Sequence, residues 1–246
     1  MEMTGNVLSK AVLTKDIGVD PNKKLFQDRK RTNFLKTYEQ QLIAFLVKKM
    51  PLFITSNNLT FIGFLGSLLV FVGFLLATYI DRTYLLLGVI GLAVNWFGDS
   101  LDGRIAYYRN TPRKWFGFAL DIIMDWIATV FIGLGYVVYA KEELEIVAFL
   151  FVVLYGWAMI ISQIRYKITD NYTIDAGLLG PTEIRIIIAL VLVAEVIVKD
   201  SIQFFAIAMC VALFIINYVD TRNLLRLGDN RDKAEQALKK KQLQDE

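Results

Sequence analysis

Four aspartates lie close together in the middle of the chain, in two pairs. Asp99 and Asp102 are three residues apart, and Asp121 and Asp125 are four residues apart. On a helix, both spacings place the two side chains on one face. Because only a short segment separates the pairs, we expect two antiparallel neighbouring helices whose carboxylates converge. Such an oxygen-rich site suits a hard divalent cation, either Mg²⁺ or Mn²⁺.

This cluster indicates chemistry at phosphorus. A divalent cation neutralises phosphate charge, and a remaining carboxylate can accept the proton of an attacking hydroxyl. The chain has no histidine, and its single cysteine, Cys210, lies in an apolar run that is typical of a core residue. A Cys/His zinc site, a disulfide framework and a serine–histidine triad are therefore excluded, which leaves carboxylates as the catalytic groups.

The segments that carry these aspartates are apolar enough to lie in a bilayer. Hydrophobic residues make up 55% of the 246-residue chain, and a helix needs roughly 20 of them in succession to cross the hydrocarbon core. The sequence predicts an all-α integral membrane protein with six transmembrane helices, and all four prolines lie outside these helices or at their edges. The predicted spans are residues 57–79, 83–107, 116–140, 144–164, 182–198 and 201–220.

The distribution of charge predicts how the spans are oriented. The amino-terminal segment, the loops at 108–115 and 165–181, and the carboxy-terminal tail are basic, whereas the alternate loops hold only Arg82, Lys141 and Lys199. By the positive-inside rule, both termini face the cytoplasm. The aspartates then lie near the cytoplasmic boundary of the membrane.

Two polar segments flank the predicted membrane domain, which covers residues 57–220. Within the amino-terminal segment 1–56, apolar residues between 34 and 50 recur at spacings of three and four. This pattern predicts an amphipathic helix at the membrane interface, or alternatively a short soluble helix that packs on the cytoplasmic loops. The cytoplasmic tail, 221–246, has the composition of a solvated charged helix or of a disordered segment.

The stretch from Asp99 to Asp125 resembles the signature of the CDP-alcohol phosphotransferases, also called CDP-alcohol phosphatidyltransferases. That signature reads D-x-x-D-G-x-x-A-R, followed after a short gap by G-x-x-x-D-x-x-x-D. The residues that match it are Asp99, Asp102, Gly103, Ala106, Gly117, Asp121 and Asp125. The resemblance implies a six-span membrane transferase of phospholipid synthesis, which moves a phosphate-linked alcohol from a CDP-alcohol to an acceptor hydroxyl and releases CMP.

The resemblance also implies a two-metal site for Mg²⁺ or Mn²⁺. Asp99, Asp102 and Asp121 would be the main ligands, and Asp125 would be both a ligand and the general base. A homodimer in the lipid bilayer is implied as well, and no nucleic-acid partner is expected.

Small residues near the aspartates are implied to make room for the cytidine diphosphate, namely Gly103, Ala106 and Gly117. At the start of the first span, T-S-N-N-L-T resembles the family's P-N-x-x-T, with Asn57 and Thr60 retained and Ser56 in place of the proline. Asn57 would contact the donor phosphates, although a helix cap explains it equally well.

One position departs from the signature, because Tyr107 stands where an arginine is expected after the alanine. If that arginine helps to hold the charge of the nucleotide, another cation must replace it here. Arg104 and Arg109 are the nearby candidates, and the alternative is that both only set the topology of the chain.

The resemblance leaves two substrate arrangements open. Either a CDP-amino-alcohol is joined to diacylglycerol, or CDP-diacylglycerol is joined to a polar alcohol such as inositol, serine or a phosphorylated alcohol. A phosphorylated acceptor would require a basic pocket, which Arg165, Lys167 and Arg185 could supply. Glu183 and Arg185 could bind the acceptor headgroup or pair structurally.

The alternative from another functional class is a non-catalytic membrane protein, either a divalent-cation carrier or an inactive relative that kept the metal site. A carrier needs a polar pathway across the membrane. The predicted acids cluster at one side instead, and the fourth span is almost wholly apolar up to Ser162. The transferase is therefore the favoured interpretation.

Overall fold

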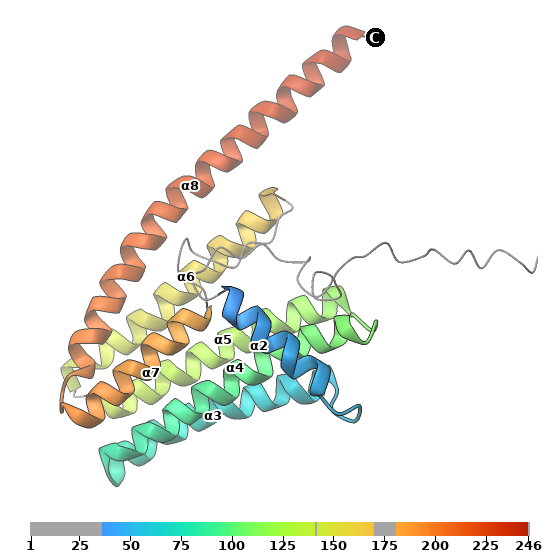
Figure 1. The fold of residues 1–246 in the computed structure, drawn as a ribbon. Coiled ribbons are helices and arrows are strands. Elements are labelled where there is room, and N and C mark those ends of the chain that lie inside the picture. Colours follow the sequence, from blue (N-terminus) through green and yellow to red (C-terminus); the bar gives the residue numbers. More distant parts are fainter. Residues whose placement is uncertain (1–35, 141, 170–180, 246) are drawn as a thin grey trace, which may run out of the picture.

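The computed structural model describes residues 36–140, 142–169 and 181–245, which form α-helices and two short 3₁₀ helices without a strand in those ranges. The α-helices are α2 (Lys36–Lys49), α3 (Ser56–Tyr79), α4 (Leu85–Tyr108), α5 (Lys114–Tyr139), α6 (Glu145–Thr169), α7 (Pro181–Ile197) and α8 (Ile202–Asp245). The 3₁₀ helices, Arg82–Tyr84 and Glu142–Leu144, precede α4 and α6. Figure 1 shows the long helices gathered in a bundle, with α8 extending well beyond it.

The helices confirm the predicted all-α membrane class. Helices α3 to α6 and α8 are long and apolar enough to cross a membrane. Each of the six helices α3 to α8 begins within two residues of its predicted start. The fifth predicted span, α7, has 17 residues, or about 26 Å at 1.5 Å per residue. Its crossing of the membrane remains a prediction.

Helices α3 and α4 pack at very short range because glycines lie between them. A Cβ atom added to Gly98 would collide with the backbone of Gly63 and Leu59. The buried Asn95 side chain strengthens this contact, since its Nδ2 donates to the Gly63 carbonyl at 3.1 Å and to Ser67 Oγ at 2.9 Å. Small residues allow such close backbone approach in membrane helices. The pairing sets the depth of the α4 carboxylates relative to α3.

Helix α5 packs on α3 and α6, and among the described residues it has little contact with α4. The two aspartate-bearing helices are therefore neighbours across a cavity, without close packing between their backbones. The short loop does make them antiparallel, but the dense packing surface of α4 is already occupied by α3. A gap remains between α4 and α5, and the carboxylates face it from both sides.

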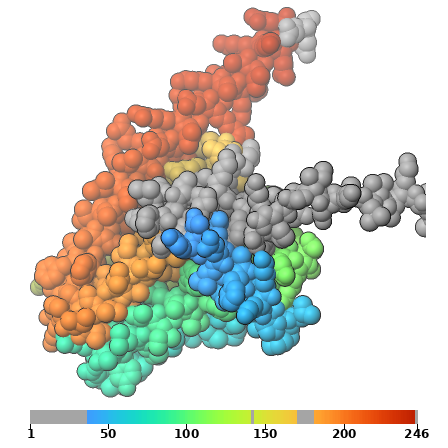
Figure 2. Space-filling model, in the orientation of Figure 1, coloured from blue at the N-terminus to red at the C-terminus, as the bar shows by residue number. Residues whose placement is uncertain are grey.

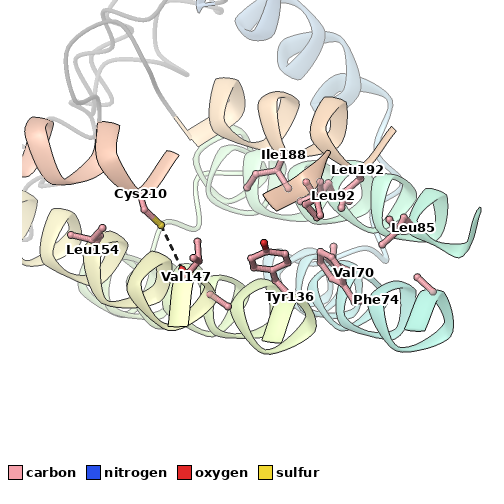
Figure 3. Close-up of a cluster of buried hydrophobic side chains, with 13 residues drawn as sticks. Val70, Phe74, Leu85, Leu92, Tyr136, Val147, Leu154, Ile188, Leu192 and Cys210 are labelled. Atoms are coloured by element: carbon pink, nitrogen blue, oxygen red, sulfur yellow. Dashed lines mark hydrogen bonds between the residues drawn. The ribbon is translucent and has the colours of Figure 1, made fainter. Parts of the chain in front are cut away.

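Side chains from all six helices, α3 through α8, contribute to the central apolar core. It includes Val70, Tyr136, Leu192 and Cys210, which come from four different helices (Figure 3). The Cys210 thiol is buried and lies 3.5 Å from the Val147 carbonyl oxygen, to which it donates. This placement confirms that the cysteine is a core residue.

Helix α2 lies on the surface of the bundle (Figure 2). On one side, Ile43 and Val47 are buried against Leu59, Leu101 and Ile105 of α3 and α4. The other side exposes large apolar side chains, including Tyr38, Leu42 and Phe45. The predicted helix is confirmed, and it packs on the bundle, while its contact with the membrane surface remains a prediction. At the other end of the chain, the tail continues α8 as an exposed helix.

Candidate active site

The four aspartates line one cavity between α3, α4 and α5. Asp99 and Asp102 face it from α4, and Asp121 and Asp125 face it from α5. Asn95, which holds α4 against α3, also lines the cavity. Because these three α4 residues follow one another at spacings of four and three, they share one face of the helix. The structure thus brings together all four carboxylates that the sequence singled out.

Asp102 is held by α3. The Thr60 hydroxyl donates to Asp102 Oδ2 at 2.7 Å, and Thr60 itself is buried. A hydrogen bond to a carboxylate is stronger than one between neutral groups. Thr60 therefore orients Asp102 toward the cavity.

Asp99 and Asp125 share a cation from α7. Arg185 Nη2 lies 2.7 Å from Asp99 Oδ2 and 3.6 Å from Asp125 Oδ1, and the arginine side chain is only 13% exposed. The sequence predicts that Arg185 lies near the same membrane boundary as the aspartates, where it could bind the acceptor headgroup or pair structurally. The signal in the sequence is a basic residue near the amino-terminal end of an apolar helix. That signal does not show which side chains of the other helices contact Arg185.

Two kinds of glycine are distinguished by their surroundings. A Cβ atom added to Gly103 or Gly117 would meet no atom within 4 Å, whereas one added to Gly98 would meet the backbone of α3. Gly98 thus permits helix packing. Gly103 and Gly117 border open space on the two helices that carry the aspartates, which is where the nucleotide is expected. Ala106, one turn after Gly103 on α4, is half-buried.

The two arginines near Tyr107 have different surroundings. Arg109 donates from its two terminal nitrogens to the backbone carbonyls of the loop between α2 and α3, with the shortest distance of 2.6 Å to Ile54. The other carbonyls are those of Met50, Pro51 and Leu52. This guanidinium holds the loop and is a poor candidate for a phosphate. Arg104 is buried, with 6% of its surface exposed.

Asn57 lies near the start of α3, in contact with the loop before α5. Its side-chain oxygen accepts a hydrogen bond from Arg113. Thr55 is the N-cap of α3, because its hydroxyl accepts from the Asn58 amide at 3.3 Å. The alternative that Asn57 is the cap is therefore wrong. Asn57 precedes Thr60 by one turn, so an exposed amide and guanidinium lie just beyond the Asp102 carboxylate.

A second cavity continues from Asp125 toward the centre of the bundle. It shares Ser67, Asn95 and Asp125 with the first cavity, and Arg185 also lines it. Its remaining walls are mostly apolar side chains of α3 to α7. Arg165 does not line either cavity and instead pairs with Asp220 of α8 at 3.3 Å.

The donor set fits a hard divalent cation in its chemistry, because carboxylates and a hydroxyl line the first cavity. In the part of the chain that is described, no three acidic side chains are close enough to form a ready metal cage. Asp99 is held by Arg185, and Asp102 is held by Thr60. A cation would therefore require some of these side chains to turn.

A known protein family matches the part of the chain that holds this site. The sequence model of the family described as CDP-alcohol phosphatidyltransferase matches residues 53–217, which is more than half of the chain. The matched part runs from the loop before α3 into α8 and contains the four aspartates and Arg185. A search of curated proteins found no match. On the strength of the family match, this chain belongs to the CDP-alcohol phosphatidyltransferase family.

Proposed function

We propose that the protein transfers a phosphate-linked alcohol from a CDP-alcohol to an acceptor hydroxyl, with release of CMP, in phospholipid synthesis. Family membership supports this class of reaction. One structural observation carries the proposal to this chain: four aspartates of two helices face one cavity, beside the open space at Gly103 and Gly117. A transferase of this kind needs both a charged phosphate site and room for the nucleotide.

Mg²⁺ or Mn²⁺ is the proposed cofactor. Asp99, Asp102, Asp121 and Asp125 would hold it, in two metal positions, and when bound it would neutralise the charge of the diphosphate and of the departing CMP. The donor nucleotide would lie toward the two open glycines. Asn57 and Arg113 offer an amide and a guanidinium to the diphosphate near the start of α3.

Asp125 is the proposed general base. It lines both cavities, so its carboxylate can meet a hydroxyl that comes from the second cavity while the donor occupies the first. The base takes the proton of that hydroxyl. The oxygen then forms a bond to the phosphorus that carries the alcohol, and the bond from this phosphorus to CMP breaks.

An uncharged lipid alcohol, such as diacylglycerol, is the acceptor that the second cavity favours. Ile132, Phe151 and Ile188 line this cavity and also line a further apolar cavity that reaches α8. A phosphorylated acceptor would need cations that are not already paired. Of the three basic residues considered for such a pocket, Arg185 lines the second cavity but is engaged by two carboxylates, Arg165 pairs elsewhere, and Lys167 lines neither cavity. We therefore propose a CDP-amino-alcohol as the donor.

The test is a matrix of donors and acceptors with the purified protein in lipid nanodiscs. Labelled CDP-amino-alcohols and CDP-diacylglycerol are each combined with diacylglycerol, inositol, serine and glycerol phosphate, and the lipid products and released CMP are measured. We expect product from a CDP-amino-alcohol with diacylglycerol. Product only from CDP-diacylglycerol would reverse the substrate assignment and keep the reaction class.

The same preparation separates the transferase from a non-catalytic protein. If no combination releases CMP, while vesicles that contain the protein take up Mn²⁺, the chain is a carrier and the proposed function is wrong. Nanodiscs prepared without the protein are the control, since any CMP release from them comes from a contaminant.

A further inference from the structure

Arg185 is a cation built into the carboxylate site. It comes from α7, whereas its two partners come from α4 and α5, and its side chain is nearly buried. Buried charges are stable only beside opposite charges, and clustered carboxylates repel one another in a medium of low dielectric constant. The guanidinium therefore supplies positive charge that allows Asp99 and Asp125 to lie close together.

The two contacts of Arg185 differ in strength. The 2.7 Å distance from Nη2 to Asp99 Oδ2 is that of a charge-assisted hydrogen bond. The 3.6 Å distance from the same nitrogen to Asp125 Oδ1 is too long for a hydrogen bond and describes an ion pair. Asp125 is therefore the partner that a competing cation can remove more easily.

We propose that Arg185 is a built-in counter-ion of Asp99 and Asp125, and that a divalent cation must displace it from Asp125. This inference rests on the proposed function, because it concerns the metal that the transfer reaction would use. Arg185 and the cation compete for one carboxylate. The position of α7 against α4 and α5 is thereby coupled to metal occupancy, and Asp125 is paired with Arg185 until the metal arrives.

Two other roles for Arg185 predict different results. A group that only orients Asp99 toward the metal would strengthen metal binding, since the supporting partners of metal ligands commonly contribute 10-fold to 100-fold in affinity. A group that only holds the helices together would change stability and leave metal affinity alone. A counter-ion weakens metal binding, because its charge repels the incoming cation. The sign of the change in metal affinity therefore decides among the three.

The experiment measures Mn²⁺ binding by the loss of the free Mn²⁺ signal in electron paramagnetic resonance. Wild type, Arg185→Gln and Arg185→Lys are titrated in nanodiscs without substrate. We expect Arg185→Gln to bind Mn²⁺ roughly tenfold more tightly than wild type, and Arg185→Lys, which keeps the charge, to stay within about threefold of it. Arg165→Gln is the matched control, because it removes a partly buried, ion-paired arginine outside both cavities. Its Mn²⁺ affinity should equal that of wild type.

Weaker or unchanged binding in Arg185→Gln overturns the inference while leaving the proposed function in place. If the wild type itself binds no Mn²⁺, the metal part of the proposed function fails, and this inference fails with it. Thermal unfolding with and without Mn²⁺ shows whether each variant is folded. If Arg185→Gln is not, Arg185→Met fills the same space without charge and takes its place, with the same expected increase in affinity.

Discussion

The Thr60 hydroxyl donates to Asp102 across 2.7 Å, and this bond links the second turn of α3 to the carboxylate pair of α4. Thr60→Val keeps the shape of the side chain and removes the donor. We expect kcat/KM for CMP release to fall roughly tenfold, which corresponds to about 1.5 kcal/mol for a hydrogen bond to a charged group. Thr60→Ser should restore most of the activity. A Thr60→Val enzyme with wild-type kcat/KM would show that Asp102 needs no support from α3.

The two kinds of glycine should respond in opposite ways to substitution. Gly103→Leu places a side chain in open space, so the protein should fold normally and its KM for the CDP donor should rise. Gly98→Ala forces α3 and α4 apart and should lower the unfolding temperature by several degrees. Thermal unfolding and donor titrations measure both effects. An unchanged donor KM in Gly103→Leu would place the nucleotide elsewhere.

Removal of divalent cations should abolish transfer. The cavity offers carboxylate oxygens, so chelation should stop CMP release, and Mg²⁺ or Mn²⁺ should restore it. Asp121→Asn should be inactive at any metal concentration while remaining folded and inserted in the membrane. Full turnover in metal-free buffer would refute the metal mechanism, and near-normal turnover of Asp121→Asn would mean that the metal site is misplaced.

Asp125→Asn tests the proposed base separately from the other carboxylates. Transfer should slow by about 10²-fold to 10⁴-fold, the usual contribution of a general base. Binding of the CDP donor should change much less, because three aspartates remain. Turnover and donor affinity are measured side by side. A parallel loss of both would make Asp125 mainly a ligand, and a variant without either loss would direct attention to Glu183.

Glu195 should matter for stability and not for transfer. It is 1% exposed and accepts hydrogen bonds from the Tyr139 hydroxyl at 2.8 Å and from the Ile202 amide at 2.8 Å, at the junction of α7 and α8. On α5, Asp125 and Tyr139 lie about 21 Å apart at 1.5 Å per residue. Glu195→Ala leaves buried donors without an acceptor and should lower the unfolding temperature clearly. The folded fraction should release CMP at the wild-type rate.

The membrane class, and the helix faces that carry the aspartates, could be predicted from the sequence. Both depend only on the order of residues within one segment of the chain. A run of about 20 apolar residues is long enough to span a bilayer wherever it occurs in a chain. Spacings of three and four place Asp99 with Asp102, and Asp121 with Asp125, on one face of any helix. The matching signature then indicated the family before any contact between helices was known.

The tertiary structure decided what depends on the rotation and depth of one helix against another. A membrane helix is apolar on most sides, so its pattern of residues does not show which side meets which neighbour. The sequence could not reveal that Gly98 packs while Gly103 lies open, or that Arg109 holds a loop. It could not pair Arg185 with Asp99 either, because these residues are 86 positions apart and meet only when α7 lies against α4.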